Sequence, residues 1–164
     1  MTYETLLYQD AYLQVPTWLV PLWPMQRRMD QWLSFCGPSN GVGDEMVPDD
    51  YPDFHFACLC FIHDIDYATG PDTDQFFHEA NRRLRGNMEA AVRAVVYEMH
   101  PFEREMKKIA GFLLADAYFE AVEIAGHDFF RPDPPGPPLT QPTVIKKLKR
   151  AGIRNPYLES AKEK

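Results

Sequence analysis

The apolar residues after position 70 recur at intervals of three and four, the spacing that places them on one face of an α-helix. In 74–99 this predicts a long amphipathic helix with the inner stripe Phe77, Ala80, Leu84, Met88, Ala91, Val95 and Met99. In 102–125 it predicts a second long helix with the stripe Phe102, Met106, Ile109, Leu113, Ala117, Ala121 and Ile124. Pro101 lies between them and ends or restarts the helix, because proline disrupts a helix interior.

The stretch 54–70, FHFACLCFIHDIDYATG, has apolar residues around most of a helical circumference, which predicts a deeply buried helix. It ends in four polar side chains, His63, Asp64, Asp66 and Tyr67. An ionised carboxylate in an apolar environment is costly unless it binds a cation or accepts several hydrogen bonds. We therefore interpret this stretch as a buried wall that carries a functional site. Residues 69–73 then break the helix and supply a cap for the next one.

The two ends of the chain differ from this middle part. Residues 1–34 mix aromatic side chains with prolines and predict an irregular or briefly helical aromatic arm, which either packs on the body or dips its apolar segment 18–23 into a lipid surface. Residues 131–164 form a proline-rich linker and a basic tail, which is either solvated or swapped, or contacts an anionic membrane or a partner. Residues 35–130 form the helical domain between them. The chain is predicted to be mainly α, with no run of alternating strand residues and no substantial sheet.

Composition narrows the class of protein. With 164 residues, 45% of them hydrophobic, the chain is long enough for one domain with a substantial core. Its 17 basic and 24 acidic side chains argue against a nucleic-acid partner and favour a metal cation. No apolar run is long enough to span a membrane, and Glu4 and Asp10 interrupt any secretory signal, so we expect a protein that is cytoplasmic as synthesised.

The segment 35–52, FCGPSNGVGDEMVPDDYP, is a glycine- and proline-rich loop just before the buried helix. Glycines let backbone carbonyls turn toward one point and present oxygen ligands to a hard cation. On a helix, Asp64 points about 100° away from His63, so Asp64 could face this loop while His63 faces a cleft as general base. Carbonyl oxygens with one carboxylate suit Ca²⁺ better than zinc.

These residues resemble the phospholipase A2 superfamily, whose signature is a cysteine-containing helix with His-Asp-x-x-Tyr after a glycine-rich calcium loop. CLCFIHDIDY at 58–67 is similar to that helix and FCGPSNG at 35–41 to that loop. The loop and the later FHEANRRL are most similar to the short domains of parvoviral capsid proteins and of bacterial and phage relatives. The resemblance covers about residues 35–125 and implies a core of long antiparallel helices with a calcium-binding-type loop.

The resemblance also implies an activity, calcium-dependent hydrolysis of the sn-2 ester of phospholipids in lipid degradation. His63 would deprotonate the attacking water, and Tyr67 would bond to the group that orients His63. Asp64 would ligate Ca²⁺, and the remaining protein ligands would be the backbone carbonyls of Phe35, Gly37 and Ser39. Calcium and the Gly37 N–H would stabilise the oxyanion. A Cys36–Cys60 disulfide is possible in an oxidising setting, with Cys58 left as a buried thiol.

Two positions depart from the family pattern. Ser39 stands where the extracellular enzymes have a further loop glycine, and Asn81 stands where the viral and bacterial relatives have an aspartate that orients the histidine. An amide can accept a hydrogen bond but cannot stabilise an imidazolium by charge, and loss of such a charge lowers the rate on the order of 10⁴-fold in a tested triad. Asp116, in the apolar LLADAYF, flanks the predicted stripe and could replace it. Three alternatives are open: Asp116 orients His63, Asn81 does, or neither does.

Three functional hypotheses follow. The first is the calcium-dependent phospholipase A2-like enzyme; the second is a catalytically degenerate module of that fold that binds calcium, lipid or a protein partner, which Asn81 favours. The third is a helical structural protein. The expected partners are a phospholipid or membrane surface and, through the terminal arms, a second copy of the chain. Cytoplasmic, virion-associated and non-classically exported locations all fit a chain without a signal peptide.

Overall fold

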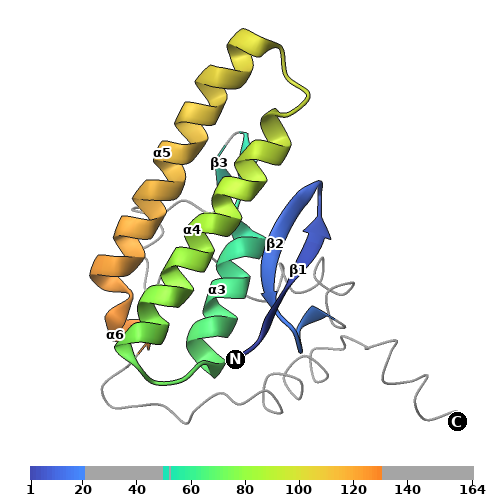
Figure 1. Cartoon of the computed structure of the whole chain (residues 1–164). Helices are drawn as coiled ribbons and strands as arrows, with labels where there is room; N and C mark the ends of the chain where they lie inside the picture. Colours follow the sequence, from blue (N-terminus) through green and yellow to red (C-terminus); the bar gives the residue numbers. More distant parts are fainter. Residues whose placement is uncertain (21–49, 52, 131–164) are drawn as a thin grey trace, which may run out of the picture.

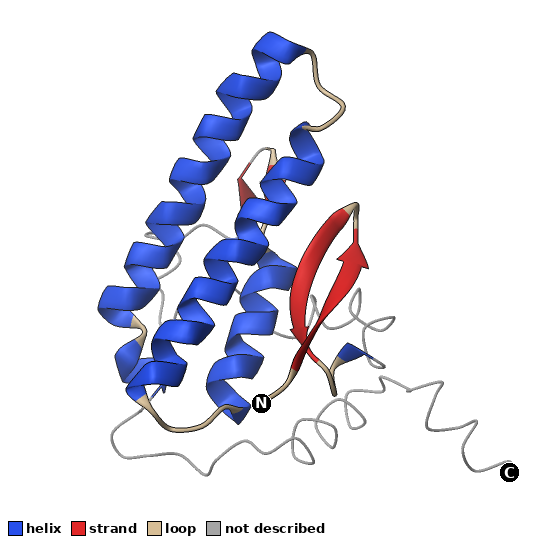
Figure 2. Cartoon of the chain, viewed as in Figure 1, coloured by secondary structure: helices blue, strands red, loops and turns tan. Residues whose placement is uncertain are grey.

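The computed structural model describes residues 1–20, 50–51 and 53–130 of the chain. In this part the protein is mainly helical, as predicted, with two small two-stranded sheets (Figure 2). The helices are α3 (Ala57–Thr69), α4 (Asp74–Val96), α5 (Pro101–Ala125) and the short α6 (His127–Phe130). Helix α4 lies between α3 and α5 and runs antiparallel to α5 (Figure 1). No helix within the described residues is both long enough and apolar enough to cross a membrane.

The helix ends follow from local sequence. The Thr73 hydroxyl accepts a hydrogen bond from the Phe76 N–H at 3.2 Å and caps α4, as predicted. Pro101 occupies the first turn of α5, where its missing N–H has no intrahelical partner to lose. Helix α3 begins at Ala57 rather than 54, because Phe54–His55 pairs as strand β4 with strand β3, Asp50–Tyr51.

The predicted burial of α3 is confirmed. Phe56, Leu59, Phe61 and Ile62 are each at most 2% exposed. Their neighbours in the core include Leu84, Met88, Val92 and Val96 of α4. The inner face of α4 thus follows the predicted stripe as far as Met88 and then continues one residue later than predicted, because Val95 is 43% exposed and Val96 is buried.

The face that α5 turns inward differs from the prediction. Its buried residues are Gly111, Ala115 and Tyr118. A Cβ at Gly111 would lie 2.7 Å from the Val92 side chain, so this glycine permits the close approach of α5 to α4. Most large members of the predicted stripe are exposed instead: Phe102 at 77%, Met106 at 59%, Ile109 at 55%, Leu113 at 64% and Ile124 at 81%.

The N-terminal segment is a β-hairpin, so the prediction of an irregular or helical arm was wrong for residues 3–16. Strand β1 (Tyr3–Tyr8) pairs antiparallel with β2 (Ala11–Pro16), with Leu6 opposite Leu13. Gln9 and Asp10 both have positive φ, 45° and 63°, as a two-residue type I′ turn requires. Such turns usually carry Asn-Gly, and the absence of that signal explains why the hairpin was missed.

The hairpin packs on the helices through alternate residues of β2. Ala11, Leu13 and Val15 are buried. The backbone of Gln14 is held by one side chain of α4: the Gln14 N–H donates to Asn87 Oδ1 at 2.7 Å, and Asn87 Nδ2 donates to the Gln14 carbonyl at 3.0 Å. Asn87 therefore gives an edge of the hairpin the two hydrogen bonds that a neighbouring strand would give.

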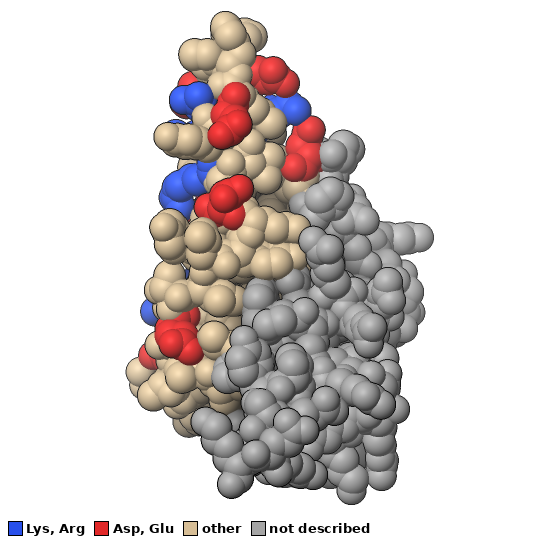
Figure 3. Space-filling model, turned by 90° about the vertical axis from the view of Figure 1, so that its right-hand side faces the viewer, with Lys and Arg blue, Asp and Glu red and all other residues tan. Residues whose placement is uncertain are grey.

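The surface of the described residues carries both signs of charge. On the face drawn in Figure 3, Lys and Arg side chains lie interspersed with Asp and Glu along the described part, at the left of the view. Among the described residues, ion pairs form within α4, such as Arg93–Glu89 at 2.9 Å, and between α5 and the turn that joins β3 to β4, such as Lys107–Asp53 at 2.8 Å.

Candidate active site

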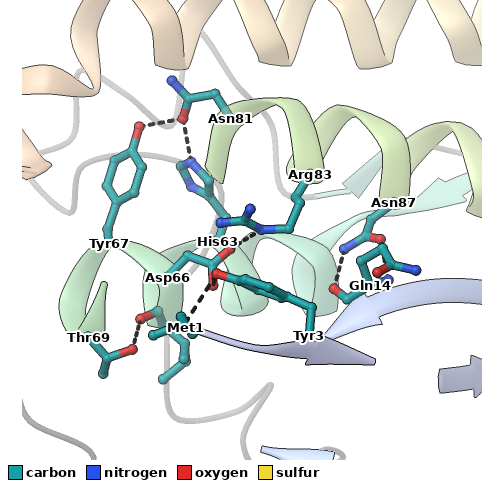
Figure 4. A network of polar contacts seen from close by, with 11 residues as sticks. Met1, Tyr3, Gln14, His63, Asp66, Tyr67, Thr69, Asn81, Arg83 and Asn87 are labelled. Atoms are coloured by element: carbon teal, nitrogen blue, oxygen red, sulfur yellow. Dashed lines mark hydrogen bonds and ion pairs between the residues drawn. The ribbon is translucent and has the colours of Figure 1, made fainter. Parts of the chain in front are cut away.

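His63 and Asn81 meet between α3 and α4. His63 is 6% exposed, Asn81 is fully buried, and His63 Nε2 lies 2.7 Å from Asn81 Oδ1. The hydroxyl of Tyr67, one turn after His63, donates to the same Asn81 oxygen at 2.5 Å (Figure 4). The predicted geometry, in which Tyr67 bonds to the group that holds His63, is therefore present, and that group is Asn81.

Asp116 is not the partner of His63, so the prediction that it orients the histidine was wrong in its geometry. Its Oδ1 lies 2.7 Å from Arg85 Nη2, and its side chain is 47% exposed. The reason is the rotation of α5. Because Ala115 and Tyr118 face inward, Asp116 lies at the side of the helix, next to the charged face of α4.

A residue that the sequence did not single out completes the cluster. Asn81 Nδ2 donates to Glu123 Oε1 at 2.8 Å, and Glu123 Oε2 lies 2.8 Å from His78 Nδ1. Glu123 is near the end of α5, and its side chain is 22% exposed. The contact depends on how α5 is placed along α4, and helical periodicity alone does not give that placement.

Gly126 lets the end of α5 lie close to this cluster. A Cβ at this position would lie 2.6 Å from the Tyr67 hydroxyl. The Val122 carbonyl oxygen would lie closer still, so a larger residue here requires a shift of the helix end or of the Tyr67 side chain.

The environment makes His63 a neutral base. Burial lowers the pKa of His63 to about 4, and the hydrogen bond with Asn81 offsets this only in part. Near pH 7 the imidazole is therefore uncharged and one ring nitrogen has a free lone pair. Burial also raises the pKa of Tyr67, so its hydroxyl keeps its proton and can donate to Asn81.

Asp64 is the second predicted site residue, next to His63 on α3. It is half-buried, and burial raises the pKa of its carboxyl to about 7. A bound cation would favour the ionised form and offset this effect, so Asp64 fits the role of a carboxylate ligand. The predicted carbonyl ligands, on Phe35, Gly37 and Ser39, lie outside the described residues. Within the described residues, no three His, Cys, Asp or Glu side chains cluster so as to hold a metal ion.

Asp66, the other carboxylate at the end of α3, has a structural role. It is 1% exposed and accepts hydrogen bonds from the Tyr3 hydroxyl at 2.8 Å and from Arg83 Nε at 2.9 Å (Figure 4). Arg83 also lies over the Tyr3 ring, 3.9 Å from its centroid. Asp66 thus joins β1, α3 and α4 and leaves Asp64 as the carboxylate of α3 open to a ligand.

The cysteines of α3 differ in state. Cys60 is disulfide-bonded, and Cys58 is a buried thiol. The predicted partner of Cys60, Cys36, lies outside the described residues.

No family model, curated protein or solved structure matches the chain.

Proposed function

We propose that the protein is a calcium-dependent hydrolase of phospholipid sn-2 esters. The observation that carries this proposal is the bond between His63 Nε2 and Asn81 Oδ1, an oxygen that also accepts from Tyr67. It leaves a buried, neutral imidazole whose second nitrogen can act on a water molecule. The substrate class comes from the resemblance of the His-Asp-x-x-Tyr helix and the glycine loop.

Each residue has a separate task in this proposal. His63 takes a proton from water through Nδ1, while Asn81 and Tyr67 hold the ring in place. Asp64, with the carbonyls of Phe35, Gly37 and Ser39, would hold Ca²⁺, which would act as a Lewis acid on the ester carbonyl. The Gly37 N–H would donate to the same carbonyl oxygen.

A non-catalytic module is the second candidate, and Asn81 favours it. The imidazolium that forms when His63 takes a proton needs stabilisation, and an amide supplies a dipole rather than a full charge. Such a module would bind calcium or lipid through the same surface without turnover.

The test is hydrolysis of phosphatidylcholine vesicles that carry a fluorescent sn-2 chain, with the full chain, in calcium and in chelator. We expect calcium-dependent release of the sn-2 fatty acid. His63→Gln should lower the rate by about 10²-fold or more, because it removes the general base. Asp64→Asn should lose the calcium-dependent part of the rate, so that its rate in calcium falls to the rate measured in chelator.

Asp116→Asn is the matched control, because it changes an exposed carboxylate that pairs with Arg85, and it should keep the wild-type rate. Turnover that survives His63→Gln would disprove the enzyme. If there is no turnover, but calcium raises Tm and Asp64→Asn removes that shift, the second candidate is supported.

A further inference from the structure

We propose that Glu123 is a positioning residue that sets the tautomer of His63 through the side-chain amide of Asn81. The catalytic meaning of this inference rests on the proposed function, but the tautomer itself can be measured without turnover. The observation behind it is that Asn81 lies between three polar groups with different hydrogen-bonding abilities.

The three groups constrain the amide unequally. A neutral imidazole nitrogen and a tyrosine hydroxyl can each either donate or accept, so His63 and Tyr67 alone permit both orientations of the amide. A carboxylate can only accept. Glu123 Oε1, at 2.8 Å, therefore requires the Asn81 NH₂ group on its side.

This choice determines the other side of the amide. With the NH₂ group toward Glu123, Asn81 Oδ1 faces His63 Nε2 at 2.7 Å and the Tyr67 hydroxyl. An amide oxygen only accepts, so Nε2 must carry the hydrogen. The lone pair of neutral His63 is then on Nδ1, the nitrogen that does not face Asn81.

The flipped amide is disfavoured by the same contact. It would bring Asn81 Oδ1 against a carboxylate oxygen with no hydrogen between them, at a fully buried position. His78 acts on the far side of Glu123, where its Nδ1 bonds to Oε2 and so leaves Oε1 for Asn81.

The tautomer determines whether the lone pair of His63 is available to a water molecule. A histidine with its hydrogen on Nδ1 would have its lone pair directed at Asn81, where no water can approach. Glu123 thus supplies through one amide what an aspartate at position 81 would supply directly: an acceptor fixed against Nε2. It does so without bringing a charged side chain into contact with the imidazole.

The test is two-bond ¹H–¹⁵N correlation NMR of the ¹⁵N-labelled full chain at pH 8, where neutral tautomers are distinguished by their nitrogen shifts. In the wild type we expect Nε2 to be protonated and Nδ1 to have the shift of an unprotonated nitrogen. In Glu123→Gln the side chain at position 123 can donate as well as accept, so the side-chain amide of Asn81 can flip. The ratio of tautomers should then move toward Nδ1–H by about tenfold, as loss of one hydrogen-bond preference implies.

Two further variants separate this effect from general damage. His78→Ala leaves the Glu123–Asn81 bond in place and should keep the wild-type tautomer. Asn81→Asp combined with Glu123→Gln should restore Nε2–H, because a carboxylate at position 81 accepts in either orientation.

Glu123→Leu gives a second test of the same contact, with Tm and the amide spectrum as checks of the fold. A wild-type tautomer ratio in both Glu123→Gln and Glu123→Leu would overturn the inference. A chain that hydrolyses no phospholipid but shows the expected tautomer shift would disprove the proposed function and leave this inference standing.

Discussion

At the scale of single residues, Asn81 and Glu123 divide a task that a single carboxylate could perform. Asn81 supplies the acceptor at His63 and Glu123 supplies the negative charge, 2.8 Å beyond the amide nitrogen. This arrangement predicts that a charge at position 81 is tolerated only if the charge at position 123 is removed.

The free energy of unfolding measures the coupling between positions 81 and 123 directly. Asn81→Asp would bring two carboxylates into contact at a buried position, and we expect the free energy of unfolding to fall by about 3 kcal/mol. Adding Glu123→Gln should recover at least half of that loss, since the remaining carboxylate then accepts from the glutamine amide. Urea unfolding of the wild type, both single variants and the double variant gives the coupling energy. Independent, additive effects of the two substitutions would contradict the predicted contact.

Asp64 gives a pH dependence of known sign. Burial raises its pKa from 3.8 to about 7, so the native state binds a proton that the unfolded state releases between those values. In calcium-free buffer, the contribution of Asp64 to stability is thus present at pH 4 and lost as the pH rises through 7.

The lowered pKa of His63 acts in the opposite direction, because its contribution is lost as the pH falls from 6.5 to about 4. The effect of Asp64 must therefore be read as the difference between Asp64→Asn and the wild type. We expect Asp64→Asn to gain stability relative to the wild type as the pH rises from 4 to 7. Urea unfolding of both proteins over that pH range measures the difference. Calcium at pH 8 should reverse the order; a difference that does not change with pH would contradict the raised pKa.

The part of the site that could be predicted from the sequence is the part formed by neighbouring residues of one helix. His63 and Tyr67 share a helix face, so their spacing alone indicated that both could meet one group. Asn81 was recognised as a candidate, but the choice between Asn81 and Asp116 depended on the rotation of α5. Glu123 carried no local signal, because its role arises from its contact with α4.

At the scale of elements, α4 and α5 show that the same periodicity can mark a buried or an exposed stripe. Leu84 of α4 is 2% exposed, whereas Leu113 of α5 is 64% exposed, although both lie on a predicted apolar stripe. Helix α5 packs instead through small residues, since Gly111 and Ala115 allow closer approach than leucine or isoleucine would. The hairpin was missed for a related reason: the alternation in 11–16 is short and its turn lacks glycine.

The two leucines provide a matched pair of substitutions. Leu84→Ala should lower the free energy of unfolding by about 2–5 kcal/mol, because it opens a cavity in the core. Leu113→Ala should change it by less than about 0.5 kcal/mol, because the side chain is mainly in solvent. Both values follow from urea unfolding with the same m-value. Equal losses would show that the α5 stripe is covered in the folded protein.

At the scale of the whole molecule, the question is whether the hairpin and the helices unfold as one unit. Three kinds of contact join them: the buried side chains of β2, the two hydrogen bonds between Asn87 and Gln14, and the Tyr3–Asp66–Arg83 cluster. A hairpin alone is marginally stable in water. Its order therefore depends on these contacts with α3 and α4, the helices that carry His63 and Asn81.

Native-state hydrogen exchange tests this dependence at the Gln14 amide, whose N–H donates to Asn87. If the molecule is one cooperative unit, this amide exchanges with the free energy of global unfolding measured in urea. Asn87→Ala removes both hydrogen bonds to the Gln14 backbone, each worth about 0.5–1.5 kcal/mol, so we expect the exchange free energies of the hairpin amides to fall by about 1–3 kcal/mol. The core amide of Met88 on α4 serves as the reference. Leu13, which pairs with Leu6 and keeps that pairing in the variant, reports on the hairpin. Equal losses at Leu13 and Met88 would show that hairpin and helices open together; a loss at Leu13 without one at Met88 would show that the hairpin opens by itself.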